Sequence, residues 1–250
     1  MKKILLFLFF SCTISLFSQI LPRWSDAPLT TSIIIPCAAC HFKHLRPLLE
    51  AYQHQTLLPD EIAISLSEVD LLNSTDIDTL EKGPWPFALT IHRHSARRSA
   101  GANRNFACMK SKADLLICQD ADDLPHPQRV EIVKYLFEHY QLDHLIHAWL
   151  PDTDEFTPYD PATIQMYHFR SVDALNNSPL ILQRIRIHHG NVCVLRKLIR
   201  TLHWEDCLPA DRDVQFNVDA YRRTSHTAVI FSELVKYRWS LSAYRPENAL

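Results

Sequence analysis

The sequence predicts an α/β protein whose central sheet is mainly parallel and is flanked by helices. Short runs of β-branched or apolar residues, each of strand length, recur at 32–36, 61–66 and 115–118. Segments whose apolar residues follow helical spacing lie between and after these runs. A strand, a helix and a second strand normally form a parallel pair with a right-handed crossover, so this alternation indicates a mainly parallel sheet.

The first strand–helix–strand unit covers residues 32–66. Ser32–Pro36 is a β-branched strand that the proline is expected to end. Apolar residues at i, i+3, i+4 and i+7 then predict a helix, at Leu45, Leu48, Leu49 and Tyr52. Pro59 and Asp60 turn the chain into the second strand at 61–66.

The alternation continues beyond this unit. Residues 67–86 are polar and are expected to form a loop, which leads to a third strand at 87–92. A helix with Ser99 as its N-cap is predicted at 99–112, and an amphipathic helix at about 128–140. The second half of the chain is less regular. Its predicted elements are strands or extended segments at 144–150, 164–170, 180–188, 190–196, 227–231 and 234–239, helices at 198–202 and 213–222, and loops at 152–160 and 204–212.

Composition excludes several classes of function. With 250 residues, 47% hydrophobic and 22% charged, the chain resembles an ordinary globular protein. A formal net charge of −2 gives no electrostatic basis for binding nucleic acid. Only three glycines are present, which excludes a P-loop and a G-x-G-x-x-G dinucleotide site. If the protein binds phosphates, a metal ion must take the place of a glycine-rich loop.

Residues 1–22 have the pattern of a targeting segment. Lys2 and Lys3 precede the apolar run Ile4–Phe10, and the next charged residue is Arg23. This arrangement is typical of a signal peptide or a short signal anchor. We therefore expect a protein that is membrane-associated or belongs to the secretory pathway.

Three aspartates follow the apolar strand at 115–118. Asp120, Asp122 and Asp123 lie just beyond its carboxyl end, the edge at which open α/β sheets bind ligands. Carboxylates at i, i+2 and i+3 on one turn are able to converge on a hard divalent cation, Mg²⁺ or Mn²⁺, that keeps open positions for phosphate oxygens. The alternative is an acidic turn that caps the following helix, with Asp123 near the helix N-terminus.

Five motifs, in order, extend this interpretation. They are S-I-I-I-P at 32–36, Q-T-L-L-P-D-E-I-A-I-S at 55–65, S-A-G-A-N-R-N-F-A at 99–107, Q-D-A-D-D at 119–123 and G-N-V-C-V-L-R at 190–196. Together they resemble the family 2-type glycosyltransferases of the GT-A fold, and the likeness spans about residues 32–223. The resemblance implies a single GT-A-like domain over 23–250, with a donor-binding half at about 30–125 and an acceptor half at about 126–240.

The resemblance also implies a nucleotide-diphospho-sugar donor, a UDP- or GDP-sugar, whose diphosphate is bridged by Mn²⁺ or Mg²⁺. Asp120 and Asp122 match the D-x-D positions, which contact metal and donor, and Asp123 is able to replace either. Arg104 matches an arginine near the nucleotide, and a solvated helix arginine is the alternative for it. The other substrate-binding positions that the motifs carry over are Pro36 and Gly190.

Two further positions bear on the donor and metal sites. Where the family has Asp-Asp after the second strand, this chain has Ser67 and Glu68, which are expected to contact the donor instead. Asp70 is an alternative, and the nucleotide preference stays open. His226, after the late helix, is a candidate third metal ligand, because a C-terminal histidine serves in some GT-A enzymes.

An inverting transfer needs a base to take the proton of the acceptor hydroxyl. The family carries this base in an E-D motif at the start of a late helix, and the matching run at 211–216 makes Asp213 the candidate. Arg212 replaces the family glutamate. A rival segment with a literal E-D, also expected to contact substrate, is Trp204, Glu205 and Asp206. If Asp213 is not the base, it is a carboxylate that the helix dipole favours.

The leading hypothesis is a metal-dependent glycosyltransferase that acts with inversion on a glycan, lipid or protein acceptor. A nucleotidyltransferase also uses carboxylate-held Mg²⁺ but normally carries a glycine- and lysine-rich loop, and residues 36–44 contain no glycine. The third hypothesis is a non-catalytic GT-A-like domain that binds glycans or proteins. The lost Asp-Asp favours it, whereas clustered carboxylates, which repel one another without a cation, argue against it.

Overall fold

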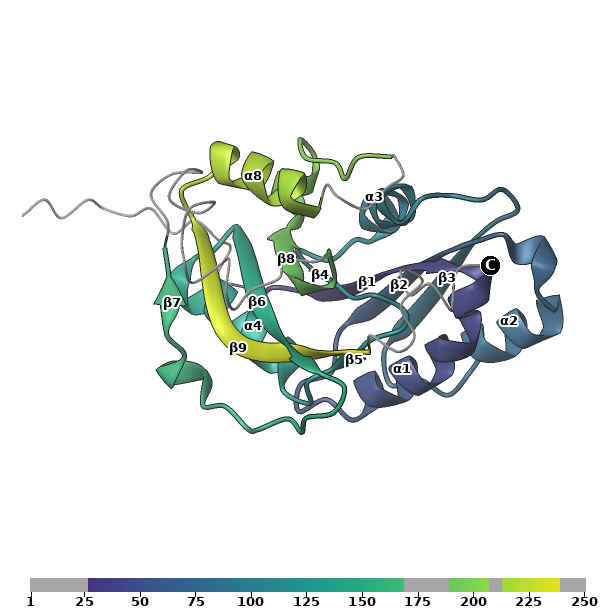
Figure 1. The fold of residues 1–250 in the computed structure, drawn as a ribbon, viewed down its shortest axis with the longest axis horizontal. Coiled ribbons are helices and arrows are strands. Elements are labelled where there is room, and N and C mark those ends of the chain that lie inside the picture. Colours follow the sequence, from purple (N-terminus) through teal and green to yellow (C-terminus); the bar gives the residue numbers. More distant parts are fainter. Residues whose placement is uncertain (1–26, 169–188, 207–212, 239–250) are drawn as a thin grey trace, which may run out of the picture.

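A computed structural model of the protein describes residues 27–168, 189–206 and 213–238. Within them the chain forms one nine-stranded sheet with helices on both of its faces (Figure 1). The targeting segment predicted at 1–22, the extended segment predicted at 180–188 and Arg212 lie outside the described residues. Among the helices of these ranges, none combines the length and the apolar character needed to cross a membrane.

The sheet is parallel in its first half and mixed in its second. Its strands are β1 (Thr31–Ala38), β2 (Glu61–Ser67), β3 (Ala88–His94), β4 (Leu115–Cys118), β5 (Leu124–Pro125), β6 (His144–Pro151), β7 (Met166–Tyr167), β8 (Val192–Leu195) and β9 (Thr227–Tyr237). They are arranged in the order β3-β2-β1-β4-β8-β6-β9-β5, and β7 pairs with β9. β3, β2, β1 and β4 are mutually parallel, as the strand–helix alternation predicts. β8 is antiparallel to β4 and to β6 and joins the two halves.

Two hydrophobic clusters cover the two faces of the sheet. The helices are α1 (Leu45–Gln53), α2 (Ser74–Glu81), α3 (Ala100–Lys110), α4 (Arg129–Tyr140), α7 (Arg196–Ile199) and α8 (Asp213–Arg223), with short 3₁₀ turns η1 (Ala39–His44), η2 (Val69–Leu71), η3 (Pro161–Thr163) and η4 (His189–Asn191). α1, α2 and α4 pack on one face with Ile33 and Ile35, and α3, α7 and α8 on the other with Ile34. Successive strand residues point to opposite faces, so β1 contributes to both clusters.

The structure corrects the expected end of the first strand. β1 continues through Pro36 to Ala38. Gln119 N donates to Ile34 O at 3.0 Å, so the even-numbered residues of β1 direct their backbone groups toward β4. β4 ends at Cys118, which is paired with Ile34. The N–H that Pro36 lacks would therefore face a position that β4 has already left, and no ladder hydrogen bond is lost.

The polar segment 67–86 is not a loop throughout, because it contains α2. Asn73 caps this helix by accepting a hydrogen bond from Thr75 N at 2.9 Å. Of the eight residues, Ile77 and Leu80 are the buried ones. Two apolar positions give too sparse a periodicity to predict a helix from sequence.

Three boundaries in the second half also differ from the predictions. The strands predicted at 227–231 and 234–239 are one strand, β9, whose pairing with β6 shifts register near Ala148. A bulge of this kind bends a strand without ending it. Gly190 lies in η4, so the glycine-led strand begins at Val192, and the short helix predicted at 198–202 is α7 at Arg196–Ile199.

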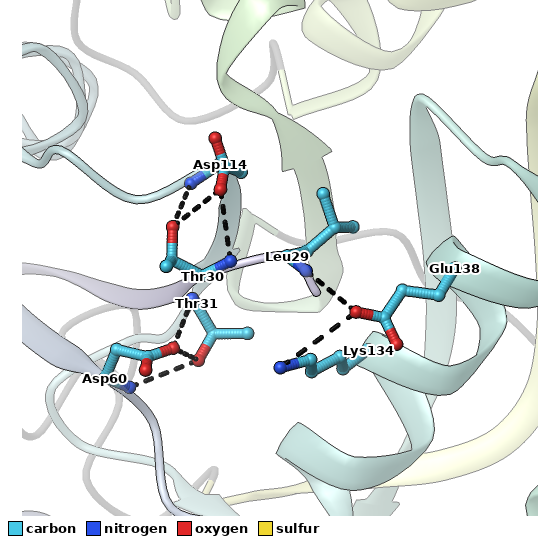
Figure 2. Close-up of polar contacts among 7 residues, drawn as sticks. All are labelled: Leu29, Thr30, Thr31, Asp60, Asp114, Lys134 and Glu138. Carbon is cyan, nitrogen blue, oxygen red and sulfur yellow. Dashed lines mark hydrogen bonds and ion pairs between the residues drawn. The ribbon is translucent and has the colours of Figure 1, made fainter. Parts of the chain in front are cut away.

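The residues that lead into β1 are held by carboxylates from three other parts of the chain (Figure 2). The hydrogen bonds are Leu29 N to Glu138 at 2.8 Å, Thr30 N and Oγ1 to Asp114 at 3.1 and 2.7 Å, and Thr31 N and Oγ1 to Asp60 at 2.7 and 3.0 Å. These bonds fix the place and the direction in which the chain reaches the sheet.

A buried histidine links the sheet to α8. His144, at the start of β6, is 0% exposed, and its Nε2 lies 2.8 Å from Asn217 Oδ1 on α8. Burial lowers the pKa of His144 to about 4, and no group in the described part of the chain forms a hydrogen bond with its Nδ1. The folded protein therefore holds this imidazole in its neutral form.

We expect His144 to make the protein less stable in acid. An unfolded histidine takes up a proton near pH 6.5 whereas folded His144 does not, so stability falls as the pH drops from about 6.5 toward 4. In urea unfolding, the stability advantage of the wild type over His144→Gln should shrink by about 2 kcal/mol between pH 7 and pH 5. His54→Gln, at an exposed position, is the control. An advantage that is equal at both pH values would contradict this assignment.

Candidate functional site

The three aspartates lie on a turn at the carboxyl end of β4, where β1 and β2 also end. Asp123 N donates to Asp120 O at 3.3 Å and closes the turn, and the chain then enters β5. β1, β2 and β4 are parallel, so their carboxyl ends meet at one edge of the sheet. The predicted strand-then-carboxylate arrangement is present, at the edge where open α/β sheets bind ligands.

Asp120 is held by a buried arginine. Arg104, on α3, is 2% exposed and forms an ion pair with Asp120 Oδ1 through Nη2. Its Nε and Nη1 are also buried, yet no described group accepts a hydrogen bond from them. A Cβ added at Gly190 would lie 3.0 Å from Asp120 Oδ2, so the glycine leaves room for the carboxylate. Arg104 is thus a buried residue of the site, and the alternative of a solvated helix arginine is wrong.

Asp123 is buried beside Asp120, and Asp122 is half-buried. Asp123 is 1% exposed; its Oδ1 accepts from Arg238 N at 2.9 Å, whereas its Oδ2 accepts no hydrogen bond from the described residues. Arg238 Nε donates to Asp122 O, and Asp122 Oδ2 lies 3.8 Å from His41 Nδ1. Burial, followed by the charge of Asp120, raises the pKa of Asp122 and of Asp123. The turn therefore concentrates carboxylates whose negative charge is poorly compensated.

These oxygens suit a hard divalent cation. Within the described ranges, no three His, Cys, Asp or Glu side chains converge as a ready-made metal site. Mg²⁺ in phosphate-handling sites is commonly held by one or two carboxylates, with substrate phosphates and water as the remaining ligands. Asp122, and the unpartnered Oδ2 of Asp123, fit that kind of site, so the donor set agrees with the predicted metal.

The structure does not bring His226 to this turn. His226 O accepts hydrogen bonds from Asp143 N and His144 N, at the amino end of β6. The turn contacts Arg238, which follows the other end of the eleven-residue strand β9. His226 therefore lies at the opposite edge of the sheet and is not a third ligand here.

A buried amide joins α3 to the ends of β1 and β2. Asn103 is 2% exposed, and its Nδ2 donates to Cys37 O at 3.3 Å and to Ser67 Oγ at 3.2 Å. Its Oδ1 accepts from Ser65 Oγ at 3.0 Å, and Ser65 Oγ lies 3.1 Å from His94 Nε2. Ser67 is accordingly a buried bridge between strands rather than an open side chain.

Glu68, the next residue, adopts a left-handed conformation with φ 61° and ψ 35°. Non-glycine residues pay a steric cost there and are found most often at turns and functional sites. Pro36 is buried within β1, so it supports the site from beneath. Of Pro36, Ser67 and Glu68, Glu68 is the one whose side chain is not buried, and the alternative residue Asp70 is exposed.

The amino half of α3 also holds the segment 204–206. Asn105 Nδ2 donates to Trp204 O at 2.7 Å, and Trp204 N donates to Asn105 Oδ1 at 2.9 Å. The Trp204 ring is 2% exposed and stacks on Phe216 of α8, with centroids 3.8 Å apart. Trp204 is thus a packing residue that connects α3 to α8.

The next two residues touch the N-terminus of α3. Ser99 Oγ donates to Asp206 Oδ1 at 2.7 Å and, as the predicted N-cap, accepts from Ala102 N at 3.0 Å. A Cβ added at Gly101 would lie 2.3 Å from Glu205 O. The literal E-D segment is therefore held close to the helix that carries Arg104. Asp213 begins α8, and its side chain lies outside what the structure describes.

A residue that the sequence analysis missed lies beneath the site. Arg129, at the start of α4, is 0% exposed. Its Nη2 donates to Cys118 O and to Gly190 O at 2.6 Å each, and its Nη1 bonds Gln119 Oε1 and Tyr52 OH. The one local sign of its burial in the sequence is its position next to the apolar residues of the helix predicted at about 128–140.

A family model described as Glycosyl transferase family 2 matches residues 32–200. The chain belongs to glycosyl transferase family 2. This confirms the predicted family and the predicted class of glycosyltransferase. No curated protein sequence matches the chain.

Solved structures of glycosyltransferases have the same GT-A fold. S. aureus TarS 1–349 in complex with UDP-GlcNAc has a TM-score of 0.66 and 15% identity, over 84% of this chain and 58% of that one. The mannosyltransferase PcManGT from Pyrobaculum calidifontis, in complex with GDP-Man and Mn2+, has a TM-score of 0.53 and 16% identity, over 82% and 57%. At such identities the likeness shows the fold alone, and this chain spans less than two thirds of either structure.

In this family 2 domain we expect Gly101→Ala to be destabilising, although alanine is the better helix former. The new Cβ would meet backbone, Glu205 O, which is unable to move aside without shifting 204–206. Overpacking of this kind costs about 1–3 kcal/mol, measured as the free energy of unfolding in urea. Ala100→Gly, at the exposed neighbouring position, is the control and should cost less than about 1 kcal/mol. A stabilising Gly101→Ala would show that the close approach is absent.

Proposed function

We propose that this protein transfers a sugar from a UDP- or GDP-sugar to an acceptor hydroxyl, with Mn²⁺ or Mg²⁺ held at the aspartate turn. The observation that carries the proposal is the pairing of half-buried Asp122 with buried Asp123 beside Asp120, where Asp123 Oδ2 accepts no hydrogen bond from any described group. Family membership and similar structures whose complexes contain UDP-GlcNAc, or GDP-Man and Mn2+, support the same reaction.

Each residue of the turn has a distinct proposed role. Asp122 and the free oxygen of Asp123 bind the cation. When bound, that cation supplies positive charge against the diphosphate that leaves. Asp120 is held by Arg104, whose unpartnered Nε and Nη1 are donors suited to phosphate oxygens of the nucleotide. Glu68, in its left-handed conformation beside the ends of β1 and β2, is the proposed contact to the nucleoside.

The transfer is proposed to invert the sugar. One carboxylate must then take the proton of the acceptor hydroxyl as the new bond forms. Asp213 is the proposed base, because it begins α8 on the acceptor side of the domain. Glu205 and Asp206 remain the rival pair, since α3 holds them next to Arg104. The acceptor is a hydroxyl of a glycan, lipid or protein.

We expect UDP or GDP to bind only in the presence of Mn²⁺ or Mg²⁺, as measured by calorimetric titration. Asp122→Asn should weaken metal-dependent binding at least about tenfold, because a neutral amide replaces a ligand carboxylate. Asp154→Asn, at an exposed aspartate of the loop after β6, is the control and should bind as the wild type does. Absence of nucleotide binding in a folded protein would favour the non-catalytic glycan- or protein-binding alternative.

We expect Asp213→Asn to lower kcat by about 10²–10⁴-fold and to leave nucleotide affinity unchanged, as is typical for loss of a general base. Hydrolysis of the sugar nucleotide, with water in place of the acceptor, provides an assay before the acceptor is known. Glu205→Gln and Asp206→Asn are the matched comparisons and should cost less than about tenfold. If one of them shows the larger loss, the base belongs to that segment. The anomeric configuration of the first product, followed by NMR, tests inversion.

A further inference from the structure

The ends of three helices meet at the edge of the sheet opposite the aspartate turn. Arg196, on α7, donates through Nη1 to Ser111 O, just after α3. Lys197 Nζ lies 2.7 Å from Asp143 Oδ1, and Thr224 Oγ1, just after α8, donates to Asp143 Oδ2 at 2.6 Å. We call the surface formed by residues 109–114, 143, 196–200 and 217–224 the amino edge.

The amino edge is basic. Its basic side chains are Lys110, Lys112, Arg196, Lys197, Arg200, Arg222 and Arg223, and its acidic ones are Asp114, Asp143 and Asp219; Asp60 and Glu138, which bind Thr31 and Leu29, add two carboxylates beside it. All of the basic residues except Arg196 are exposed. Met109, which is 61% exposed, adds an apolar side chain. This surplus of positive charge stands out because the whole chain has a formal net charge of −2.

The chain reaches the sheet at this same edge. Asp114 belongs to the amino edge and holds Thr30 through its backbone N and its Oγ1 (Figure 2). Six residues separate Leu29 from Pro22, at which the predicted targeting segment ends. The chain from Pro22 to Leu29 spans at most about 25 Å when fully extended. A membrane that holds residues 1–22 must therefore lie close to the amino edge.

We propose that the amino edge rests on an anionic lipid surface, while the apolar N-terminal segment attaches the same chain to that membrane. The proposal depends on the membrane attachment expected of residues 1–22 and is independent of the sugar-transfer chemistry. One short apolar anchor binds reversibly, and a basic patch beside it makes attachment stable. Lysine and arginine side chains are attracted to anionic headgroups within about a Debye length, 8–10 Å in physiological salt.

This placement orients the candidate site. β1 has eight residues and so spans about 26 Å from the amino edge to the carboxyl edge. With the amino edge on the lipid, the aspartate turn at the other end of the parallel strands faces the aqueous phase. Nucleotide sugars, which are soluble anions, then reach the turn without approaching the anionic surface.

The test measures binding of the purified full-length chain to lipid vesicles by flotation. One set of vesicles contains phosphatidylcholine alone, and the other contains roughly one third phosphatidylglycerol. We expect the wild type to bind the anionic vesicles at least about tenfold more strongly. A triple variant, Lys112→Gln, Arg200→Gln and Arg223→Gln, should lose most of this difference and still bind neutral vesicles through its apolar segment. High salt should remove the same difference in the wild type.

The control is a triple variant with the same change of charge at the opposite edge, Lys43→Gln, Arg46→Gln and Arg97→Gln. All six substituted residues are exposed, and circular dichroism verifies folding. The control should bind anionic vesicles as the wild type does. Equal losses in both triple variants, or wild-type binding that is indifferent to phosphatidylglycerol, would overturn the proposal. The proposal would also be overturned if the amino-edge triple variant bound vesicles normally but no longer bound immobilised polyphosphate. The amino edge would then recognise an anionic polymer and not a lipid surface.

Discussion

The buried guanidinium of Arg129 organises the base of the candidate site. Arg129 donates to two backbone carbonyls, Cys118 O at the end of β4 and Gly190 O in η4, and to side chains of α1 and β6. These acceptors are uncharged, so hydrogen bonds, each worth about 1.5–3 kcal/mol to a charged donor, must offset the cost of burying the cation. All of them are in place only when β4, η4, β6 and α1 occupy their native positions. The turn that follows Cys118 is therefore supported by a fully enclosed network.

The helix α3 gives the site its second support through four residues in the run 101–105. Gly101 admits the backbone of the 204–206 segment, Asn103 binds the ends of β1 and β2, Arg104 holds Asp120, and Asn105 clamps Trp204. Donor-side and acceptor-side segments thus meet on a single helix. The spacing of the G-A-N-R-N run follows from this, because each residue faces a different neighbour around the helix axis.

Much of the fold could be predicted from sequence because local patterns encode it. The apolar spacing of Leu45, Leu48, Leu49 and Tyr52 predicts α1, and all four residues are buried. Features that depend on distant parts of the chain escaped prediction. Pro36 is tolerated in β1 because β4 ends early, and the burial of Arg129 requires acceptors that no neighbouring residue provides. The prediction of His226 as a metal ligand failed for a different reason. A histidine suits a metal ion chemically, but its residue type does not tell at which end of β9 it lies.

The aspartate turn is completed from the far end of the chain. Arg238 donates its backbone N–H to Asp123 across 115 positions and its side chain to Asp122 O. During synthesis a chain emerges from its N-terminus, and early segments are able to fold before later ones exist. The parallel strands and the turn itself are therefore made long before Arg238 emerges from the ribosome. A nascent or truncated chain that stops before β9 ends has the three aspartates and the Arg104–Asp120 ion pair but lacks both contacts from Arg238, so the turn is complete only after Arg238 has been synthesised.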